Sequence, residues 1–143
     1  MATFSKFNQF VQDLSTKKHD LSADVLKIML TNTAPVATNA VYADVSGTEL
    51  ANGNGYTTGG ATATEVSCAQ TSGILKLVLS QVVWTCATSA MGPFRYAVLY
   101  NSTQTTPLKP LIGWYDYGSS VTLNVGETFT IALDQTNGTL TIQ

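Results

Sequence analysis

The N-terminal part of the chain carries apolar side chains at helical spacing. These positions are Phe4, Phe7, Phe10, Val11 and Leu14. Polar side chains stand between them, so the pattern predicts a short amphipathic helix over residues 3–15. The apolar face of this helix needs a cover. That cover is either the domain's own sheet or a neighbouring subunit, because a phenylalanine-rich helix suits docking into a groove.

Further along the chain, apolar and polar residues alternate with a period of two, which is typical of strands. Residues that share one face are Leu75, Leu77 and Leu79 in one segment, and Phe129, Ile131 and Leu133 in another. The predicted strands cover residues 25–30, 61–68, 73–80, 82–87, 94–100, 111–117, 120–124, 128–133 and 139–142. An Asn-Gly pair within residues 134–138 favours a turn that closes a hairpin between the last two strands. The sequence therefore predicts a mainly β protein, an antiparallel β-sandwich or barrel of about eight strands with one short N-terminal helix.

Two of these strands, residues 94–100 and 111–117, are rich in aromatic side chains and face each other around a polar connection. Antiparallel pairing places Arg95, the only arginine of the chain, opposite Asp116. A guanidinium and a carboxylate can meet across such a pair. We predict that this structural ion pair fixes the register of the two strands.

Residues 36–60 lack a clear period and end in a run of glycines and asparagines. Glycine and asparagine tolerate positive φ, so this segment is predicted to be a long, shaped loop. A phosphate-binding loop needs a Gly-Lys-Ser/Thr ending between a strand and a helix, and neither feature is present. Neither this loop nor the helix is needed to complete the β core. The candidate protein-contact residues are therefore Phe4, Phe7, Phe10, Asn52, Asn54 and Tyr56.

With 143 residues, the chain is long enough for one domain over 1–143, with a helix and connection in 1–20 and a β core in 21–143. Only 11% of the residues are charged, against roughly 25% in ordinary soluble domains. A net charge of −2 offers no basic field for nucleic acid. No apolar run has the length of a secretion signal or a membrane span, so we expect no membrane partner and folding in a cytoplasm.

Candidate catalytic residues are few. His19, the only imidazole, lies in a Lys-Lys-His-Asp run and is predicted to be a solvated loop residue. No nucleophile stands in a motif that would pair it with a base. Asp116 with Glu65 or Glu127 could form a glycosidase pair, but an ion pair with Arg95 is the simpler role for Asp116. We expect no catalytic residues and no enzyme activity.

Metal and cofactor sites also lack a signature. Cys68 and Cys86 have neither CxxC spacing nor a companion histidine, so they give no metal signature. The two could pair with each other, but unpaired cysteines are usually buried, and we predict two free, buried thiols. Asp134 and Asn137 lack the alternating oxygen ligands of a calcium loop and suit a hairpin turn instead. We expect no metal and no cofactor.

Aromatic side chains are the strongest binding signal. They are Trp84, Tyr96, Tyr100, Trp114, Tyr115 and Tyr117. Strand alternation sends Tyr115 and Tyr117 to one face and Trp114 to the other. These residues suit a core with polar tips at its rim, and the alternatives are a protein interface or a sugar-stacking platform.

Five stretches of the chain together resemble a group of small virion proteins of tailed bacteriophages. They are residues 1–8 (MATFSKFN), 26–35 (LKIMLTNTAP), 54–60 (NGYTTGG), 91–96 (MGPFRY) and 111–118 (LIGWYDYG). The resemblance implies a capsid decoration, or cement, protein: a β-rich subunit on the outside of the assembled shell, often a homotrimer. The implied partners are the major capsid protein and further copies of the chain. A tail or tail-associated structural protein and a glycan- or receptor-binding module are the alternatives.

Overall fold

The computed structural model describes residues 3–143. Its strands are β1 (Thr3–Lys6), β2 (Leu26–Thr31), β3 (Ala61–Thr62), β4 (Glu65–Thr71), β5 (Ile74–Leu79), β6 (Val82–Thr85), β7 (Met91–Asn101), β8 (Leu111–Leu123), β9 (Thr128–Ile131) and β10 (Leu140–Ile142). Its helices are α1 (Asn8–Ser15) and α2 (Ala43–Ser46). The described residues thus confirm the mainly β class with a short helix near the N-terminus.

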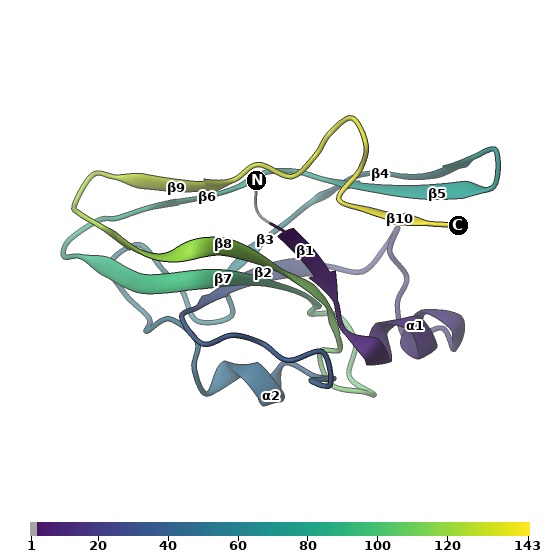
Figure 1. Ribbon diagram of the computed structural model, residues 1–143, viewed down its shortest axis with the longest axis horizontal. Helices are drawn as coiled ribbons and strands as arrows, with labels where there is room; N and C mark the ends of the chain where they lie inside the picture. Colours follow the sequence, from purple (N-terminus) through teal and green to yellow (C-terminus); the bar gives the residue numbers. More distant parts are fainter. Residues whose placement is uncertain (1–2) are drawn as a thin grey trace.

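The strands form two antiparallel layers, one above the other in Figure 1. The lower layer is a five-stranded sheet in the order β1-β8-β7-β2-β3. The upper layer combines the strands β10-β5-β4 with the pair β6-β9. In the described residues the layers stay open at their sides, so of the two predicted architectures the closed barrel is wrong.

Apolar side chains fill two separate clusters. The larger cluster lies between the layers and joins Ile28 and Leu30 of β2 to residues of the upper layer such as Leu79. The smaller cluster lies on the other face of the five-stranded sheet, where Met29 and Val98 pack with Val45 of α2. The five-stranded sheet is therefore covered on both faces, by strands on one and by the loop that carries α2 on the other.

The N-terminal helix is shorter than its pattern predicts. Residues 3–6 form β1, which pairs with β8 and sets Phe4 opposite Tyr115. The rings of Phe4 and Tyr115 lie 5.0 Å apart, and the Phe4 ring occupies the space that a side chain at Gly113 would fill. Pairing with β8 satisfies backbone groups that a free helix end would leave unpaired. Met1 and Ala2, which belong to the first resembling stretch, lie outside the described residues.

Strand boundaries also depart from the pattern. The segment 61–68 divides between β3 and β4, and all of 120–124 except Asn124 belongs to the end of the long strand β8. The predicted closing hairpin is wrong, because β9 pairs with β6 while β10 pairs with β5. Asp134 instead accepts hydrogen bonds from the backbone N–H groups of Thr136 and Asn137, at 2.8 and 2.7 Å. The turn therefore leads from β9, which lies beside β6, to β10, which lies beside β5, within the upper layer.

Candidate functional site

The phenylalanines predicted to contact a partner are part of the chain's own core. Phe7 has no exposed surface, and its ring lies 4.6 Å from that of Trp114. Phe10 is 3% exposed and packs in the cluster between the layers. Their prediction as contact residues is wrong in this conformation, because both side chains are already enclosed by the sheet. Phe4 is half-buried on β1.

The glycine-rich loop likewise packs inward. Tyr56 is 2% exposed, which contradicts its prediction as a contact residue. Asn54 is half-buried and donates a hydrogen bond to the carbonyl of Ala90, 3.2 Å away. Asn52 is exposed, and its side chain accepts a hydrogen bond from the N–H of Thr58 at 3.1 Å. Of the three loop residues predicted to contact a partner, only Asn52 is therefore fully at the surface.

Glycine lets this loop approach the sheet closely. A Cβ atom at Gly60, whose φ is +72°, would collide with the carbonyl oxygen of Ile28. A Cβ atom at Gly55, whose φ is +102°, would collide with that of Thr85. Both contacts would be far inside van der Waals distance, so the loop conformation requires glycine at these positions.

A carboxylate holds the loop in place through what we call the Glu49 network, formed by Tyr42, Glu49, Tyr56, Gly59 and Tyr100. Glu49 accepts hydrogen bonds from the hydroxyls of Tyr42 and Tyr56, the latter at 2.6 Å, and from the Gly59 N–H at 2.7 Å. The Tyr56 hydroxyl also accepts a bond from the Leu30 N–H at 3.1 Å, and the Tyr100 hydroxyl donates to the Gly59 carbonyl at 2.7 Å. Every tyrosine hydroxyl of this network is bonded.

The network also changes the acidity of its tyrosines. Burial, and then the hydrogen bond to Glu49, raises the pKa of Tyr42 and of Tyr56 well above the ordinary value. Burial raises the pKa of Tyr100 to about 12. The hydroxyls therefore stay protonated and serve as donors, which suits a structural role. Sequence analysis missed Glu49, whose one local signal is a tyrosine seven residues before and after it.

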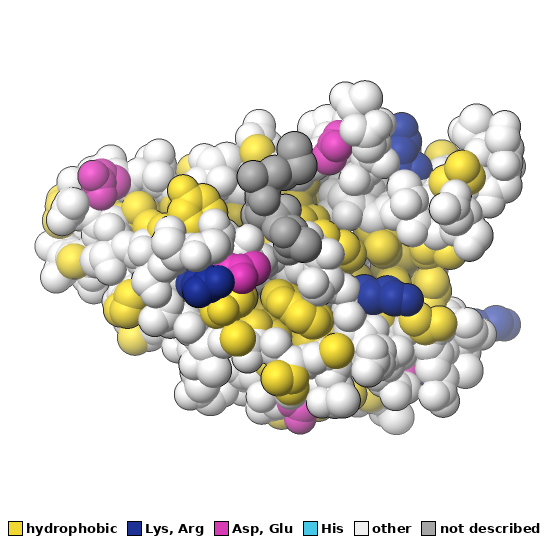
Figure 2. Space-filling model, in the orientation of Figure 1, with side chains coloured by type: hydrophobic (Ala, Val, Ile, Leu, Met, Phe, Trp, Pro, Cys, Tyr) yellow, Lys and Arg dark blue, Asp and Glu magenta, His cyan; other side chains and the backbone are white. Residues whose placement is uncertain are grey.

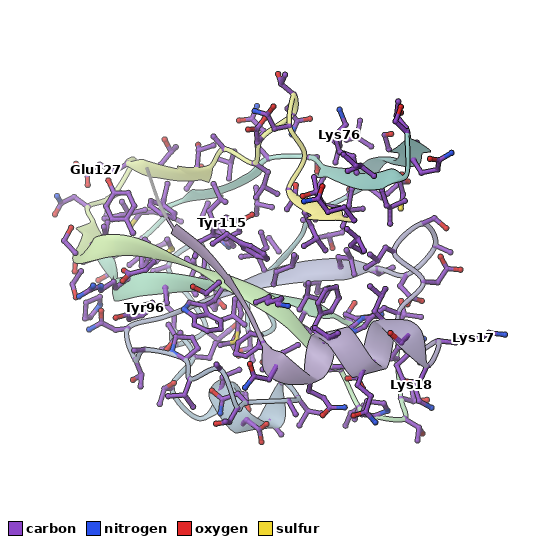
Figure 3. All side chains as sticks on the ribbon, turned by 45° about the vertical axis from the view of Figure 1, so that its right-hand side comes forward. Lys17, Lys18, Lys76, Tyr96, Tyr115 and Glu127 are labelled. Carbon is purple, nitrogen blue, oxygen red and sulfur yellow. The ribbon has the colours of Figure 1, made fainter. Side chains whose placement is uncertain are left out.

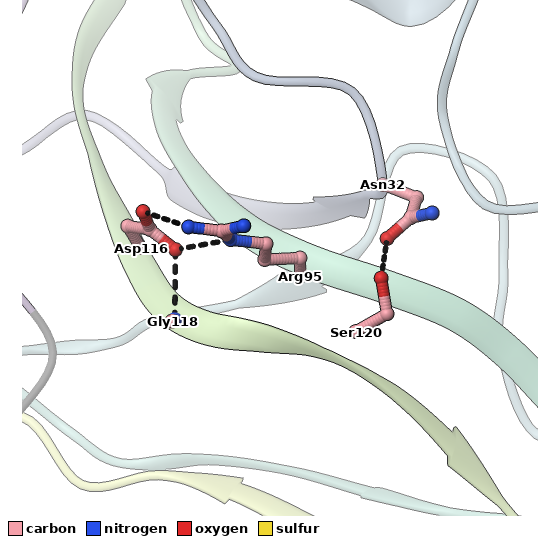
Figure 4. A network of polar contacts seen from close by, with 5 residues as sticks. All are labelled: Asn32, Arg95, Asp116, Gly118 and Ser120. Atoms are coloured by element: carbon pink, nitrogen blue, oxygen red, sulfur yellow. Dashed lines mark hydrogen bonds and ion pairs between the residues drawn. The ribbon is translucent and has the colours of Figure 1, made fainter.

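The predicted ion pair between Arg95 and Asp116 is confirmed (Figure 4). Arg95 donates from Nε and Nη2 to the two carboxylate oxygens, at 2.7 and 2.9 Å. The predicted register, with Arg95 directly opposite Asp116, is wrong by one residue, because Asp116 lies opposite Tyr96 and the ladder is irregular between Phe94 and Tyr96. The hydrogen bonds from Arg95 and from the Gly118 N–H lower the pKa of Asp116. Both side chains are about one-third exposed, so the pair holds local geometry and adds little to stability.

His19 is buried, which contradicts its prediction as a solvated residue. It is 6% exposed, its ring lies 5.2 Å from that of Phe10, and its Nδ1 lies 3.2 Å from the side-chain nitrogen of Asn101. Burial lowers the pKa of His19, while the nearby carboxylates of Asp13 and Asp24 oppose this shift. Sequence analysis missed this burial because the surrounding Lys-Lys-His-Asp run is polar. The imidazole joins α1 to the end of β7.

A cavity of about 350 Å³ opens between the layers. We call it the interlayer cavity; its walls include Phe4, Phe94, Tyr115, Tyr117, Phe129 and Ile131. Figure 2 shows apolar side chains along the seam between the layers, and Figure 3 shows Tyr115 in the space between β8 and the upper layer. Burial raises the pKa of Tyr115 to about 12. Of the six aromatic residues singled out in the sequence, Tyr115 and Tyr117 thus lie together at one cavity, whereas Trp114 packs on the opposite face.

The remaining sequence predictions concern thiols and metals. Cys68 and Cys86 are both free, as predicted, and Cys86 is buried, but the predicted burial of Cys68 is wrong because its side chain is half-buried. Burial raises the pKa of the Cys68 thiol. Among residues 3–143, histidine, cysteine and carboxylate side chains form no group of three or more that could hold a metal ion. The described helices are too short or too polar to cross a membrane.

Comparison with known proteins found no relative of this chain: no family model, no curated protein and no solved structure matches it.

Proposed function

We propose that this protein is a non-enzymatic structural subunit of a bacteriophage particle, which binds and stabilises the assembled capsid shell as a decoration, or cement, protein. The five resembling stretches support this proposal because they come together in space. Four of them supply β1, β8, β7 and β2, which are neighbours in one sheet, and the fifth is the glycine-rich loop packed on that sheet. The resemblance therefore concerns one structural unit.

An uncharged outer face on β6 and β9 is the observation that carries the proposal. Neither strand contains a charged residue. Val83, which is 54% exposed, pairs with the exposed Thr130 on this face. Charged side chains are depleted where proteins contact one another, and exposed strands of free proteins usually carry them. This face, in place of the buried phenylalanines, is the surface that we assign to shell contact.

Weak contacts at such a face suffice if they are repeated. A homotrimer presents three copies of the face to neighbouring shell subunits, and linked contacts gain affinity through effective concentration. The partners in this proposal are the major capsid protein and the protein's own copies, on the outside of the capsid.

Antibody labelling of source particles, viewed by electron microscopy, tests the location. Label over the head is the expected result, and label confined to the tail would favour the alternative of a tail-associated protein and end the cement proposal. Binding to stripped particles then tests the face. Val83→Lys should weaken binding about tenfold or more, since a buried lysine at an interface is costly. Val25→Lys, at an exposed valine away from β6 and β9, is the matched control and should bind as the parent does.

A further inference from the structure

The interlayer cavity runs beside the backbone of β9. Its lining includes the consecutive residues 129–134. Successive side chains of a strand point to opposite faces, so a cavity lined by consecutive residues passes along the edge of the strand itself. In the described part of the chain, β9 has β6 as its neighbour on one side and no strand on the other. The cavity therefore lies against an open strand edge.

The backbone groups at this edge follow from the ladder. The ladder pairs Trp84 with Phe129, and the same register continues to Cys86 and Glu127. The Cys86 N–H donates a hydrogen bond to the Glu127 carbonyl at 2.9 Å, so Cys86 and Glu127 form a hydrogen-bonded pair. Hydrogen-bonded residues alternate along an antiparallel pair, so Phe129 bonds to β6 while the N–H and C=O groups of Thr128 and Thr130 point to the open side. These groups have no strand to bond among the described residues.

The wall across from this edge is largely apolar and aromatic, with Arg95 as its charged residue. Tyr117 meets the Phe129 ring edge-on at 5.6 Å, and Phe94 meets it at 4.8 Å. Phe4 and Tyr115 continue the wall on β1 and β8. Natural open edges usually carry proline, lysine or another residue that blocks pairing through charge or a missing N–H, whereas β9 carries neither proline nor a charged residue. The site thus combines an unblocked edge with room for apolar side chains.

We propose that the open edge of β9 and the interlayer cavity bind an extended, uncharged peptide segment by strand addition. Main-chain hydrogen bonds form to Thr128 and Thr130, and alternate apolar side chains of the peptide enter the cavity. A peptide fits better than a small ligand because only a second backbone bonds a row of edge groups at strand spacing. The segment comes from the shell subunit. This choice of donor rests on the proposed function, whereas the binding site itself does not.

A model peptide tests the site on the isolated protein. The probe is acetyl-Gln-Thr-Phe-Thr-Val-Thr-Gln-amide, and its control has the same side chains but a backbone N-methylated at alternate residues. The parent peptide should bind saturably in an NMR titration and slow hydrogen exchange at the Thr130 amide by about tenfold or more, as pairing protects an amide. The N-methylated control should leave that amide unprotected.

Two substitutions at one position separate backbone from side-chain effects. Thr130→Pro removes the edge N–H and leaves the bonds to β6 intact, so peptide affinity should fall about tenfold. Thr130→Val keeps the N–H in a side chain of similar shape and should bind as the parent does. Amide spectra of both variants establish that each is folded.

Several results would overturn the proposal. Equal binding of both peptides would show an apolar pocket without strand addition, and no binding of either would remove the site. If the Thr130 amide is protected in the protein without peptide and this protection disappears on dilution, the occupant is a second copy of the chain and not the shell subunit. Label on the phage tail in the microscopy experiment would reject the shell as donor while leaving the peptide result intact.

Discussion

The two faces of the five-stranded sheet differ in how completely the chain covers them. On one face, the loop that carries α2 lies over the sheet, and the Glu49 network bonds the hydroxyls of Tyr42, Tyr56 and Tyr100. On the other face, the hydroxyls of Tyr115 and Tyr117 form no hydrogen bond with any described residue, and β9 leaves one edge open. A loop can cover a face by itself, because its carboxylate bonds the tyrosine hydroxyls and its glycines let the backbone pack closely. A strand edge can be completed only by another strand, which makes the second face the one suited to a partner.

The largest expected effect is on the closed face. Gly60→Ala should lower the free energy of unfolding by about 4 kcal/mol, because the added Cβ meets the backbone of Ile28 and the residue also has positive φ. Gly73→Ala is the control, since Gly73 has φ +83° but open space around it, and should cost about 1 kcal/mol. Urea unfolding measures both. Equal costs would mean that the loop does not hold its close approach in solution.

Removal of the Glu49 carboxylate should have the second-largest effect on stability. Glu49→Ala leaves two tyrosine hydroxyls and the Gly59 N–H without their acceptor, and we expect a loss of about 3 kcal/mol in unfolding free energy. Asp44→Ala, which removes an exposed carboxylate from the same loop, should cost about 1 kcal/mol through the loss of its hydrogen bonds to the Ala40 and Val41 N–H groups. A loss at Glu49 no greater than that at Asp44 would refute the closing role of the network.

Deletion of single hydroxyls compares the two faces directly. Tyr56→Phe loses bonds to Glu49 and Leu30 and should cost about 2 kcal/mol. Tyr115→Phe loses no bond to a described residue and should change stability by less than about 0.5 kcal/mol. Urea unfolding again decides. A large cost at Tyr115 would show that the cavity face is closed by an interaction of its own.

Alkaline titration should give the smallest and most specific difference. Burial raises the pKa of Tyr100 and of Tyr115 to about 12 from an ordinary value of 10.0. Tyrosinate therefore forms first in the unfolded chain, so this stabilisation is full below about pH 10 and is lost as the pH rises towards about 12. Glu49→Gln should lower the pKa of Tyr56, whose shift includes the carboxylate, and leave that of Tyr115 unchanged. Ultraviolet absorbance of tyrosinate measures this, and equal shifts at both residues would contradict the distinction.

Local periodicity determined much of this protein. Alternation located most strands and placed Tyr115 and Trp114 on opposite faces, because a strand's side chains follow its backbone directly. The pairing of Arg95 with Asp116 also followed from two neighbouring strands and one connection. The glycine-rich segment was predicted as a loop because positive φ is a property of its residues.

The tertiary structure decided what those elements touch. Phe4 belongs to a strand because β8 is there to pair with it, and Phe7 is buried because the sheet covers it. The Glu49 network and the open edge of β9 depend on segments that are distant in sequence, and no periodicity contains such contacts. The sequence thus determined the elements through local backbone preference, while long-range packing decided which face is closed and which stays open to a partner.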